Sequence, residues 1–318
     1  MLSQIIKFLK NTSNYISGEE ISQSLKISRT AVWKYIQELR QRGYEIVAVP
    51  HLGYKLVSAP DLLLAEEIQF QLGTRVVGNK VVCHDTVSST MDEAFRLGME
   101  GAPDGTVVCA EGQTRGRGRL GRNWASARHK GIYISVILRP KFPPTELAKL
   151  TLWAAVAVSE ALEKSTGVSA LIKWPNDLLV GEKKVAGILT ELRAEVDQVK
   201  FVVIGIGVNV NHTAHQLIET GTSLRVEAQK TFLRVDVLKE ILRSLERRYL
   251  ELNEHGFKPV LDQWKKRSVT LKKWVRIADP AGVVEGQAID LDDDGGLLIR
   301  QDSGVVIKKM AGDVVQVR

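Results

Sequence analysis

A short segment rich in glycine and arginine has the clearest capacity for chemistry in this sequence. The segment GQTRGRGRLGRNWAS, residues 112–126, contains four arginines within eight residues, and we call it the arginine loop. Glycine lets backbone N–H groups approach a phosphate closely, and arginine presents a permanent charge in a fork that matches phosphate or carboxylate oxygens. Residues 112–145 contain eight Lys or Arg residues and no Asp or Glu. We therefore expect the loop to bind an anion that the chain does not supply, and to be mobile until it does.

Two other interpretations of the arginine loop stay open. It could be an RNA-binding tract of the RGG type, or a basic loop that is merely solvated. The first is disfavoured because the segment is short and lies inside an expected folded domain. Its spacing also differs from that of the phosphate-binding loop G-x-x-x-x-G-K-[ST].

A second group of polar residues lies within ALIKWPNDLLVGEKKVAGILTEL, residues 170–192. The pattern predicts a strand, a turn at 181–182 and a returning strand. Its notable polar members are Lys173, Asn176, Asp177 and Lys184. Charged residues within an apolar hairpin need partners or serve a ligand. We expect Lys184, which precedes the apolar VAGIL, to point into a site, and the neighbouring Lys183 to be an exposed turn residue.

The bulk properties limit the class of protein. A chain of 318 residues is expected to form two or three domains. The formal net charge of +7 favours anionic partners such as nucleic acid or nucleotides. Cys83 and Cys109 match no metal-binding spacing and are expected to be reduced. Because the sequence has no signal peptide and no run near the roughly twenty apolar residues that span a bilayer, we expect a cytoplasmic protein without membrane association.

The first 60 residues predict a winged helix-turn-helix domain. Ile5, Ile6 and Leu9 have helical spacing, and capping patterns at Ser17 and Ser28 predict the start of a second and a third helix. Only about three residues separate those two helices, and two short strands, YEIVAV and GYKLV, follow them. This order of elements resembles the DNA-reading domain of many bacterial regulators.

The third helix is expected to contact the major groove of DNA. The residues expected to do so are Ser28, Arg29, Thr30, Trp33, Lys34 and Gln37. One copy would cover only half of a symmetric operator, so a homodimer on an inverted repeat is expected. The domain could instead dock on the rest of the chain or on another protein. The large apolar Trp33 also leaves open that the domain no longer binds DNA.

Two further domains are expected. Residues 61–267 mix strands with amphipathic helices, which predicts an α+β domain with a mixed sheet. Residues 268–318 alternate apolar and polar residues between Asp-Gly and Ser-Gly turns, which predicts a small β-barrel of the SH3 type.

The motifs together resemble a known family. TRGRGRLGRNWAS and KWPNDLLVGEKKVAGILTEL are preceded by SST at 88–90 and followed by GIGVNVN, and in this order they resemble the biotin–protein ligases. With the winged helix in front, essentially the whole chain is similar to bacterial proteins that combine biotin ligation with repression of the biotin operon. The resemblance implies activation of biotin by ATP and Mg²⁺ to biotinyl-5′-AMP, then transfer of biotin to a lysine of a biotin carboxyl carrier domain. It also implies that biotinyl-5′-AMP is the corepressor and promotes the dimer.

The resemblance also assigns site residues. It places biotin at Ser89, Thr90, Gln113, Arg117, Gly118, Arg119, Lys184, Gly187 and Gly207. It places ATP or the adenylate at Arg119, Arg122, Trp124, Lys173, Asn176, Asp177 and Asn209. The catalytic role would belong to Lys184, Arg119 and Arg117, which can neutralise the meeting of a carboxylate with a phosphate, and Mg²⁺ would lie near Asn176 and Asp177.

Two departures and two rival functions follow from the same comparison. Leu120 stands where many family members have an arginine, and Ala127 stands where proline is common, so the closing geometry of the loop could differ. A lipoate or octanoate ligase is the nearest alternative, although the GRGRLGR and KWPND segments favour biotin. The other alternative is a biotin-sensing repressor with little ligase activity.

Overall fold

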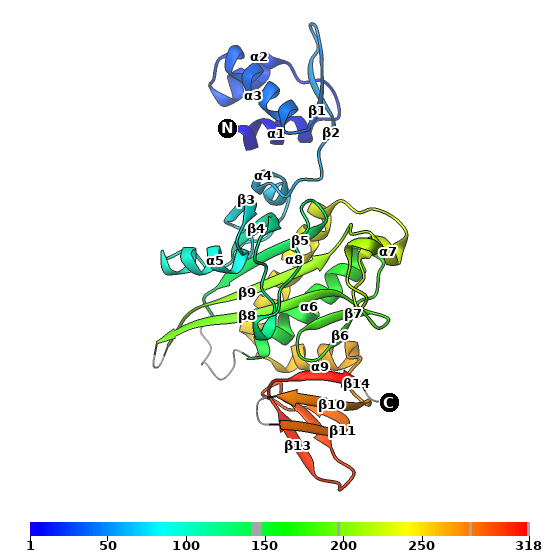
Figure 1. Ribbon diagram of the computed structural model, residues 1–318. Coiled ribbons are helices and arrows are strands. Elements are labelled where there is room, and N and C mark those ends of the chain that lie inside the picture. Colours follow the sequence, from blue (N-terminus) through cyan, green and yellow to red (C-terminus); the bar gives the residue numbers. More distant parts are fainter. Residues whose placement is uncertain (141–147, 196–197, 280–281, 317–318) are drawn as a thin grey trace. The chain divides into compact units, whose positions relative to one another are not determined.

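The chain forms two compact units, residues 1–71 and 72–318 (Figure 1). The computed structural model describes residues 1–140, 148–195, 198–279 and 282–316. The elements of the first unit are α1 (Leu2–Asn11), α2 (Gly18–Leu25), α3 (Arg29–Gln41), β1 (Glu45–Val49), β2 (Gly53–Ser58) and α4 (Ala65–Gln69).

The first unit is the predicted winged helix-turn-helix. The side chain of Ser17 accepts a hydrogen bond from the Glu20 N–H at 3.0 Å and that of Ser28 accepts one from the Ala31 N–H at 3.1 Å, so both helices begin at the expected caps. One face of α3 is buried in a core with α1 and the two strands, through Val32, Ile36 and Leu39. The opposite face of α3 is therefore left for solvent or a partner.

Helix α4 belongs to this first unit. The Tyr44 hydroxyl donates to Glu67 Oε1 at 2.6 Å, and Lys10 forms an ion pair with the same carboxylate. Burial and the adjacent carboxylate raise the pKa of Tyr44. These contacts extend the unit to Gln71, beyond the boundary expected at residue 60.

A seven-stranded mixed sheet is the centre of the second unit, as predicted. The strand order is β3-β4-β5-β9-β8-β7-β6, in which only β3 and β4 are parallel. The strands are β3 (Val81–Val87), β4 (Thr106–Gln113), β5 (Gly131–Leu138), β6 (Leu171–Lys173), β7 (Asp177–Val180), β8 (Lys183–Glu195) and β9 (Gln198–Asn209).

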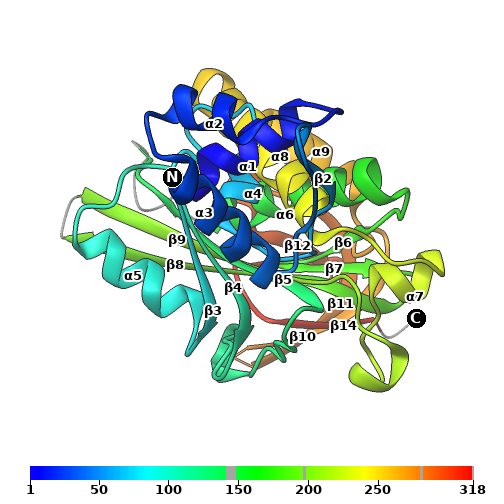
Figure 2. The same cartoon turned by 90° about the horizontal axis from the view of Figure 1, so that it is seen from above.

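Helices cover both faces of this sheet. They are α5 (Thr90–Met99), α6 (Ala148–Thr166), α8 (Arg234–His255) and α9 (Lys258–Arg267), and the short helix α7 (Leu224–Ala228) follows β9 in the chain. Helix α5 packs Met91 so closely on Gly205 of β9 that a Cβ there would lie 2.6 Å from its sulfur. On the other face, Thr151 of α6 donates to Thr190 of β8 at 2.8 Å. Seen from above, α5 and the pair α6 and α8 lie on opposite sides of β8 and β9 (Figure 2).

One predicted element was wrong. Residues 170–180 do not form a single strand, because β6 and β7 pair antiparallel with Lys173 opposite Asp177. The chain reverses across Trp174, Pro175 and Asn176. Pro175 has no N–H to donate to a neighbouring strand, so a break in the ladder at this position has a physical cause. The reversal places Lys173 and Asp177 directly opposite one another on neighbouring strands.

The C-terminal residues form a second, five-stranded antiparallel sheet, which we call the C-terminal sheet. Its order is β13-β12-β11-β10-β14. Its strands are β10 (Trp274–Asp279), β11 (Gly282–Leu291), β12 (Leu297–Arg300), β13 (Val306–Lys309) and β14 (Asp313–Gln316). It packs on the rest of the unit through the buried Trp174, whose N–H donates to Thr270 Oγ1 at 2.9 Å and whose indole N–H donates to the Gly295 carbonyl at 3.3 Å.

Within the described ranges, none of the helices combines the length and the apolar character that crossing a bilayer would require.

Candidate active site

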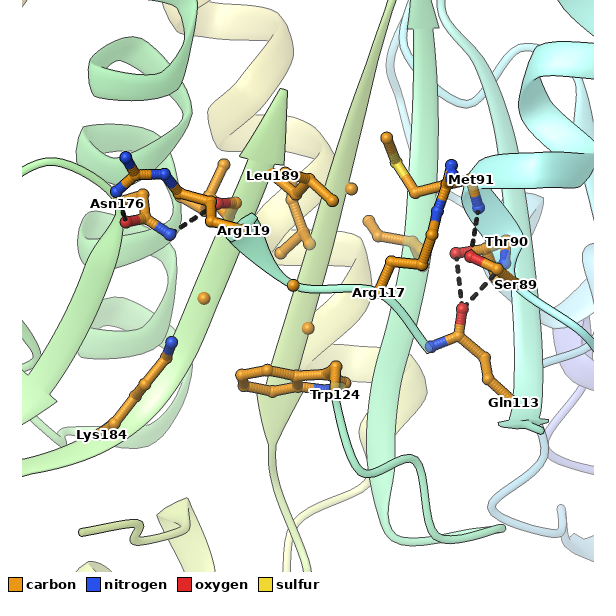
Figure 3. Close-up of a pocket in the computed structure, with 17 residues that line it drawn as sticks. Ser89, Thr90, Met91, Gln113, Arg117, Arg119, Trp124, Asn176, Lys184 and Leu189 are labelled. Atoms are coloured by element: carbon orange, nitrogen blue, oxygen red, sulfur yellow. Dashed lines mark hydrogen bonds between the residues drawn. The ribbon is translucent and has the colours of Figure 1, made fainter. Parts of the chain in front are cut away.

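Two adjoining cavities lie on the face of the large sheet that also holds α5. All nine residues expected to bind biotin line the first cavity. Apolar side chains complete its wall, among them Met91, Ile134 and Leu189. Figure 3 shows its polar end at Ser89, Thr90 and Gln113, and Lys184 with Asn176 on the opposite side. The first cavity therefore has one neutral polar end and one cationic end.

The second cavity opens beside the cationic end of the first. All seven residues expected to contact ATP or the adenylate line it. The two cavities share Gly118, Arg119, Trp124, Asn176 and Lys184. A ligand in the first cavity and a ligand in the second would therefore meet between Lys184 and Arg119.

The neutral polar end is built at the start of α5. Ser89 is the N-cap of this helix, and its hydroxyl oxygen accepts from the Met91 N–H at 3.2 Å. The N–H of Thr90 donates to Gln113 Oε1 at 2.8 Å. Because the cap oxygen is used as an acceptor, the Ser89 hydroxyl hydrogen remains to be donated toward the cavity. This end offers neutral hydrogen-bonding groups to a ligand.

Two glycines on neighbouring strands leave room for Trp124 above the sheet. Gly187 of β8 and Gly207 of β9 are directly paired. A Cβ on Gly207 would lie 2.5 Å from the indole Cε2 of Trp124, and one on Gly187 would lie 3.1 Å from Cζ3. These glycines were expected to let the backbone approach a ligand, and in the structure it is Trp124 that makes this close approach.

Lys184 and Arg119 supply the positive charge where the cavities meet. Lys184 Nζ lies 2.6 Å from Asp177 Oδ1, an ion pair without the angles of a hydrogen bond, and 5.3 Å from the centre of the Trp124 ring. Arg119 donates to Asn176 Oδ1 at 2.9 Å. Its burial lowers the pKa of the Arg119 guanidinium from its usual value, although arginine stays charged at physiological pH.

The expectation that the chain supplies no anions to the arginine loop was wrong. Arg117 lies 3.2 Å from the Asp92 carboxylate and 3.1 Å from that of Glu191. Arg122 forms an ion pair with Asp313 of the C-terminal sheet. These carboxylates come from segments distant in sequence, so counting charges within residues 112–145 could not reveal them.

Other lining residues of the second cavity were not found from the sequence. They are contributed by residues 216–218, 220–221 and 312–315 and by His212. Burial, followed by the charges of Lys130 and Arg234, lowers the pKa of His212 to about 4, so the ring is neutral at physiological pH. No local pattern in the sequence distinguishes His212, because only the fold brings it to the cavity.

The residues expected to contact DNA lie together on α3. Ser28, Arg29, Thr30, Trp33 and Lys34 are exposed and Gln37 is half-buried. Trp33 has a relative exposure of 53%, which is high for so large an apolar residue. This exposed face suits contact with a partner that has both charge and apolar groups.

Three family models match the chain in order. Residues 2–55 match an HTH domain. Residues 84–209 match the biotin/lipoate A/B protein ligase family, and residues 270–315 match the biotin protein ligase C-terminal domain.

Named relatives and solved structures agree with these models. The chain is 42% identical to the bifunctional ligase/repressor BirA of Bacillus subtilis, over 94% of this chain and 93% of that protein. It is 32% identical to the bifunctional ligase/repressor BirA of Escherichia coli, over 98% and 95%. The structure of the biotin protein ligase from Aquifex aeolicus in complex with biotin and ATP superposes with a TM-score of 0.66 at 32% identity, over 76% of this chain and 99% of that one.

The similarity includes the winged helix, the site on the large sheet and the C-terminal sheet, and the chain therefore belongs to the biotin protein ligase family, in its branch of bifunctional ligase/repressors.

Proposed function

We propose that this chain joins biotin to ATP as biotinyl-5′-AMP and then transfers biotin to a lysine of a biotin carboxyl carrier domain. The observation that supports this most directly is the meeting of the two cavities at Lys184 and Arg119. The first cavity has the neutral polar end and apolar wall that suit the ring system and aliphatic chain of biotin. The second is larger and lies where a nucleotide would place its α-phosphate beside the biotin carboxylate.

The cations at this junction address the main obstacle to the first step. A biotin carboxylate oxygen attacks the α-phosphorus and pyrophosphate leaves, so two anions must approach one another. Lys184, Arg119 and Arg117 are positioned to offset that repulsion and to stabilise the charge that develops on the phosphoryl oxygens. Their present partners, Asp177, Asn176, Asp92 and Glu191, hold these side chains near the site.

Asp177 fits a role in holding Mg²⁺ better than Asn176 does. Its Oδ1 is buried and makes no hydrogen bond with the described residues. The Asn176 oxygen accepts from Arg119, and its amide nitrogen donates to the Ile188 carbonyl at 2.9 Å. Among the described residues, no three or more His, Cys, Asp or Glu side chains are grouped so that they could hold a metal ion, so phosphate oxygens would have to complete the shell, as is usual for this ion. When bound, Mg²⁺ would neutralise charge on the nucleotide phosphates.

The arginine loop would keep water from the product of the first step. A mixed anhydride such as biotinyl-5′-AMP is hydrolysed easily, and closing the site over it excludes solvent. In the structure the loop is folded back on itself, since the Trp124 N–H donates to the Gly116 carbonyl at 2.9 Å. We propose that this closed form protects the adenylate until an acceptor lysine arrives.

Mass spectrometry of an acceptor domain tests the enzymatic proposal. A purified carrier domain is incubated with the chain, ATP, Mg²⁺ and either biotin or lipoate. We expect a biotin-sized mass gain on one lysine, a loss of this gain in Lys184→Ala, and no effect of Lys183→Ala, whose side chain is exposed and lines neither cavity. A gain only with lipoate would contradict the choice of substrate. No gain with either acid, in a chain that binds biotin, would favour a sensing repressor.

We further propose that biotinyl-5′-AMP is a corepressor that promotes a homodimer on operator DNA. The exposed face of α3 supports DNA contact, and one winged helix reads only half of a symmetric site. If the adenylate binds the dimer-competent form more tightly, it raises DNA affinity by shifting that equilibrium. Sedimentation and DNA-binding measurements with and without biotin and ATP test this, and an unchanged sedimentation coefficient together with unchanged DNA affinity would contradict it.

A further inference from the structure

A chain of hydrogen bonds connects the neutral end of the first cavity to the base of the arginine loop. Ser135 Oγ donates to Thr90 Oγ1 at 2.9 Å, and Thr90 Oγ1 donates to Gln113 Oε1 at 3.1 Å. Gln113 Nε2 then donates to Ser126 Oγ at 2.8 Å. Finally, Ser126 Oγ donates to the Trp124 carbonyl at 3.1 Å. Gln113 and Ser126 are close to the two ends of the loop, so their bond closes its base.

The direction of this chain is determined by one backbone group. The N–H of Thr90 can only donate, and it lies 2.8 Å from Gln113, so the atom of the amide that faces it must be the oxygen. The Gln113 amide nitrogen therefore faces Ser126, whose hydroxyl oxygen must accept. The hydroxyl hydrogen of Ser126 is then directed to the Trp124 carbonyl. All donors consequently point from the sheet toward the loop.

The packing around Gly116 supports a specific role for this arrangement. A Cβ at Gly116 would lie 2.4 Å from the Trp124 carbonyl oxygen, 2.8 Å from Ser126 Oγ and 2.9 Å from Gln113 Nε2. Three atoms of the hydrogen-bond chain thus converge on one residue of the loop that has no side chain. The Trp124 N–H also donates to the carbonyl of this glycine at 2.9 Å.

We infer that Ser126 is a positioning residue. It couples the binding of a ligand at the Thr90 and Gln113 end of the first cavity to the closure of the arginine loop. This inference rests on the proposed function. A ligand bonded to Thr90 and Gln113 would hold the Gln113 amide, and aligned hydrogen bonds strengthen one another in a partly buried chain. The held amide secures Ser126, and Ser126 secures the carbonyl of Trp124, whose indole covers the meeting point of the two cavities. Ser126 lines neither cavity and acts only through Gln113 and Trp124.

Adenylate retention measures this coupling directly. Full-length wild type, Ser126→Ala and Ser126→Thr are loaded with biotin and radiolabelled ATP, and release of the labelled adenylate is followed over time. We expect Ser126→Ala to release it about tenfold faster, since two hydrogen bonds are lost, and Ser126→Thr, which keeps the hydroxyl, to restore part of the retention. The KM for biotin should rise more than the KM for ATP, because the Thr90 and Gln113 end of the hydrogen-bond chain lines only the first cavity.

The matched control is Ser165→Ala on α6. Its hydroxyl is also half-buried and donates to a backbone carbonyl, that of Ala161, at 2.6 Å. Adenylate release by this variant should equal that of wild type. Equal acceleration in Ser165→Ala would mean that general loss of stability causes the effect, and it would overturn the inference.

A double-mutant cycle tests whether Gln113 and Ser126 act on adenylate release together or independently. In a Gln113→Ala background, Ser126→Ala should accelerate release clearly less than it does in wild type, because one of its two hydrogen bonds, the one to Gln113, is already gone. Additive effects, or wild-type retention in Ser126→Ala, would overturn the inference while leaving the proposed function intact. A wild-type chain that forms no adenylate would overturn the proposed function itself.

Discussion

At the scale of single residues, the site depends on charged side chains whose positions are determined by their neighbours. Lys184 is held between a carboxylate and an aromatic face, and Arg119 is half-buried with its fork on Asn176. Both positions keep a cation at the meeting point of the cavities before any ligand binds. Such preorganisation is what electrostatic stabilisation of a transition state requires.

His212 allows a prediction about pH at this scale. Because burial lowers its pKa to about 4, the folded chain leaves this ring neutral at pH values where the unfolded chain, with an ordinary pKa near 6.5, protonates it. Stability therefore falls as the pH drops between these values, and this residue should account for about 2 kcal/mol between pH 7 and 5. Urea denaturation of wild type and His212→Gln at both pH values measures the difference.

The exposed His255 provides the control for that comparison. The His255→Gln variant should lose as much stability between pH 7 and 5 as wild type does, whereas His212→Gln should lose less. If His212→Gln and wild type lose the same amount, the ring of His212 is not the group that resists protonation.

At the scale of elements, the two faces of α3 have different roles: the buried face stabilises the first unit, and the exposed face is available for recognition. Its buried residues hold the first unit together, whereas Trp33 and Lys34 are exposed. We expect Trp33→Ala to change the free energy of unfolding by less than about 0.5 kcal/mol and to weaken binding to a duplex selected by the protein from random sequence by roughly tenfold. Lys34→Ala should instead reduce the slope of log affinity against log salt concentration by the amount that corresponds to about one phosphate contact.

Lys7 on α1 offers a charge-matched control, because it is exposed on another helix of the same unit. Replacing it by alanine removes the same charge as Lys34→Ala and should leave the salt dependence almost unchanged. Operator binding by Trp33→Ala at the wild-type level would remove this residue from the DNA contact, and it would favour a different partner for the exposed face.

At the scale of the whole molecule, the C-terminal sheet is part of the catalytic unit. Thr270, just before this sheet, and Gly295 within it accept the two N–H groups of the buried Trp174, and Lys149 of α6 donates to the Asp293 carbonyl at 2.9 Å. The sheet also contributes residues 312–315 to the second cavity. The first unit has its own core within residues 1–71.

Two truncations should therefore behave differently. A chain that ends at Arg267 should lose adenylation and unfold at a lower temperature, because Trp174 would lose its apolar cover and two hydrogen-bond acceptors. A chain that begins at Leu72 should keep adenylation and lose DNA binding. Thermal unfolding and adenylate formation measure both, and a chain ending at Arg267 with the wild-type midpoint would contradict the dependence on the C-terminal sheet.

The sequence by itself determined the local elements and the identity of the site. Caps at Ser17 and Ser28 and the helical spacing of Val32, Ile36 and Leu39 depend on residues within one or two turns, so the winged helix could be predicted from them. The motifs around Arg119 and Lys184 likewise consist of contiguous residues. For that reason the motifs identify these residues without any geometry, and the structure brings them into two adjoining cavities.

How distant residues meet depends on the tertiary fold. Asp92, Glu191 and Asp313 pair with Arg117 and Arg122 of the arginine loop from three separate segments, and His212 belongs to no motif. The reversal at Trp174–Asn176 depends on which strands pair, and that choice depends on burial across the whole sheet. Strand pairing and ion pairs join residues that are far apart in the chain, so neither leaves a periodic signal in the sequence.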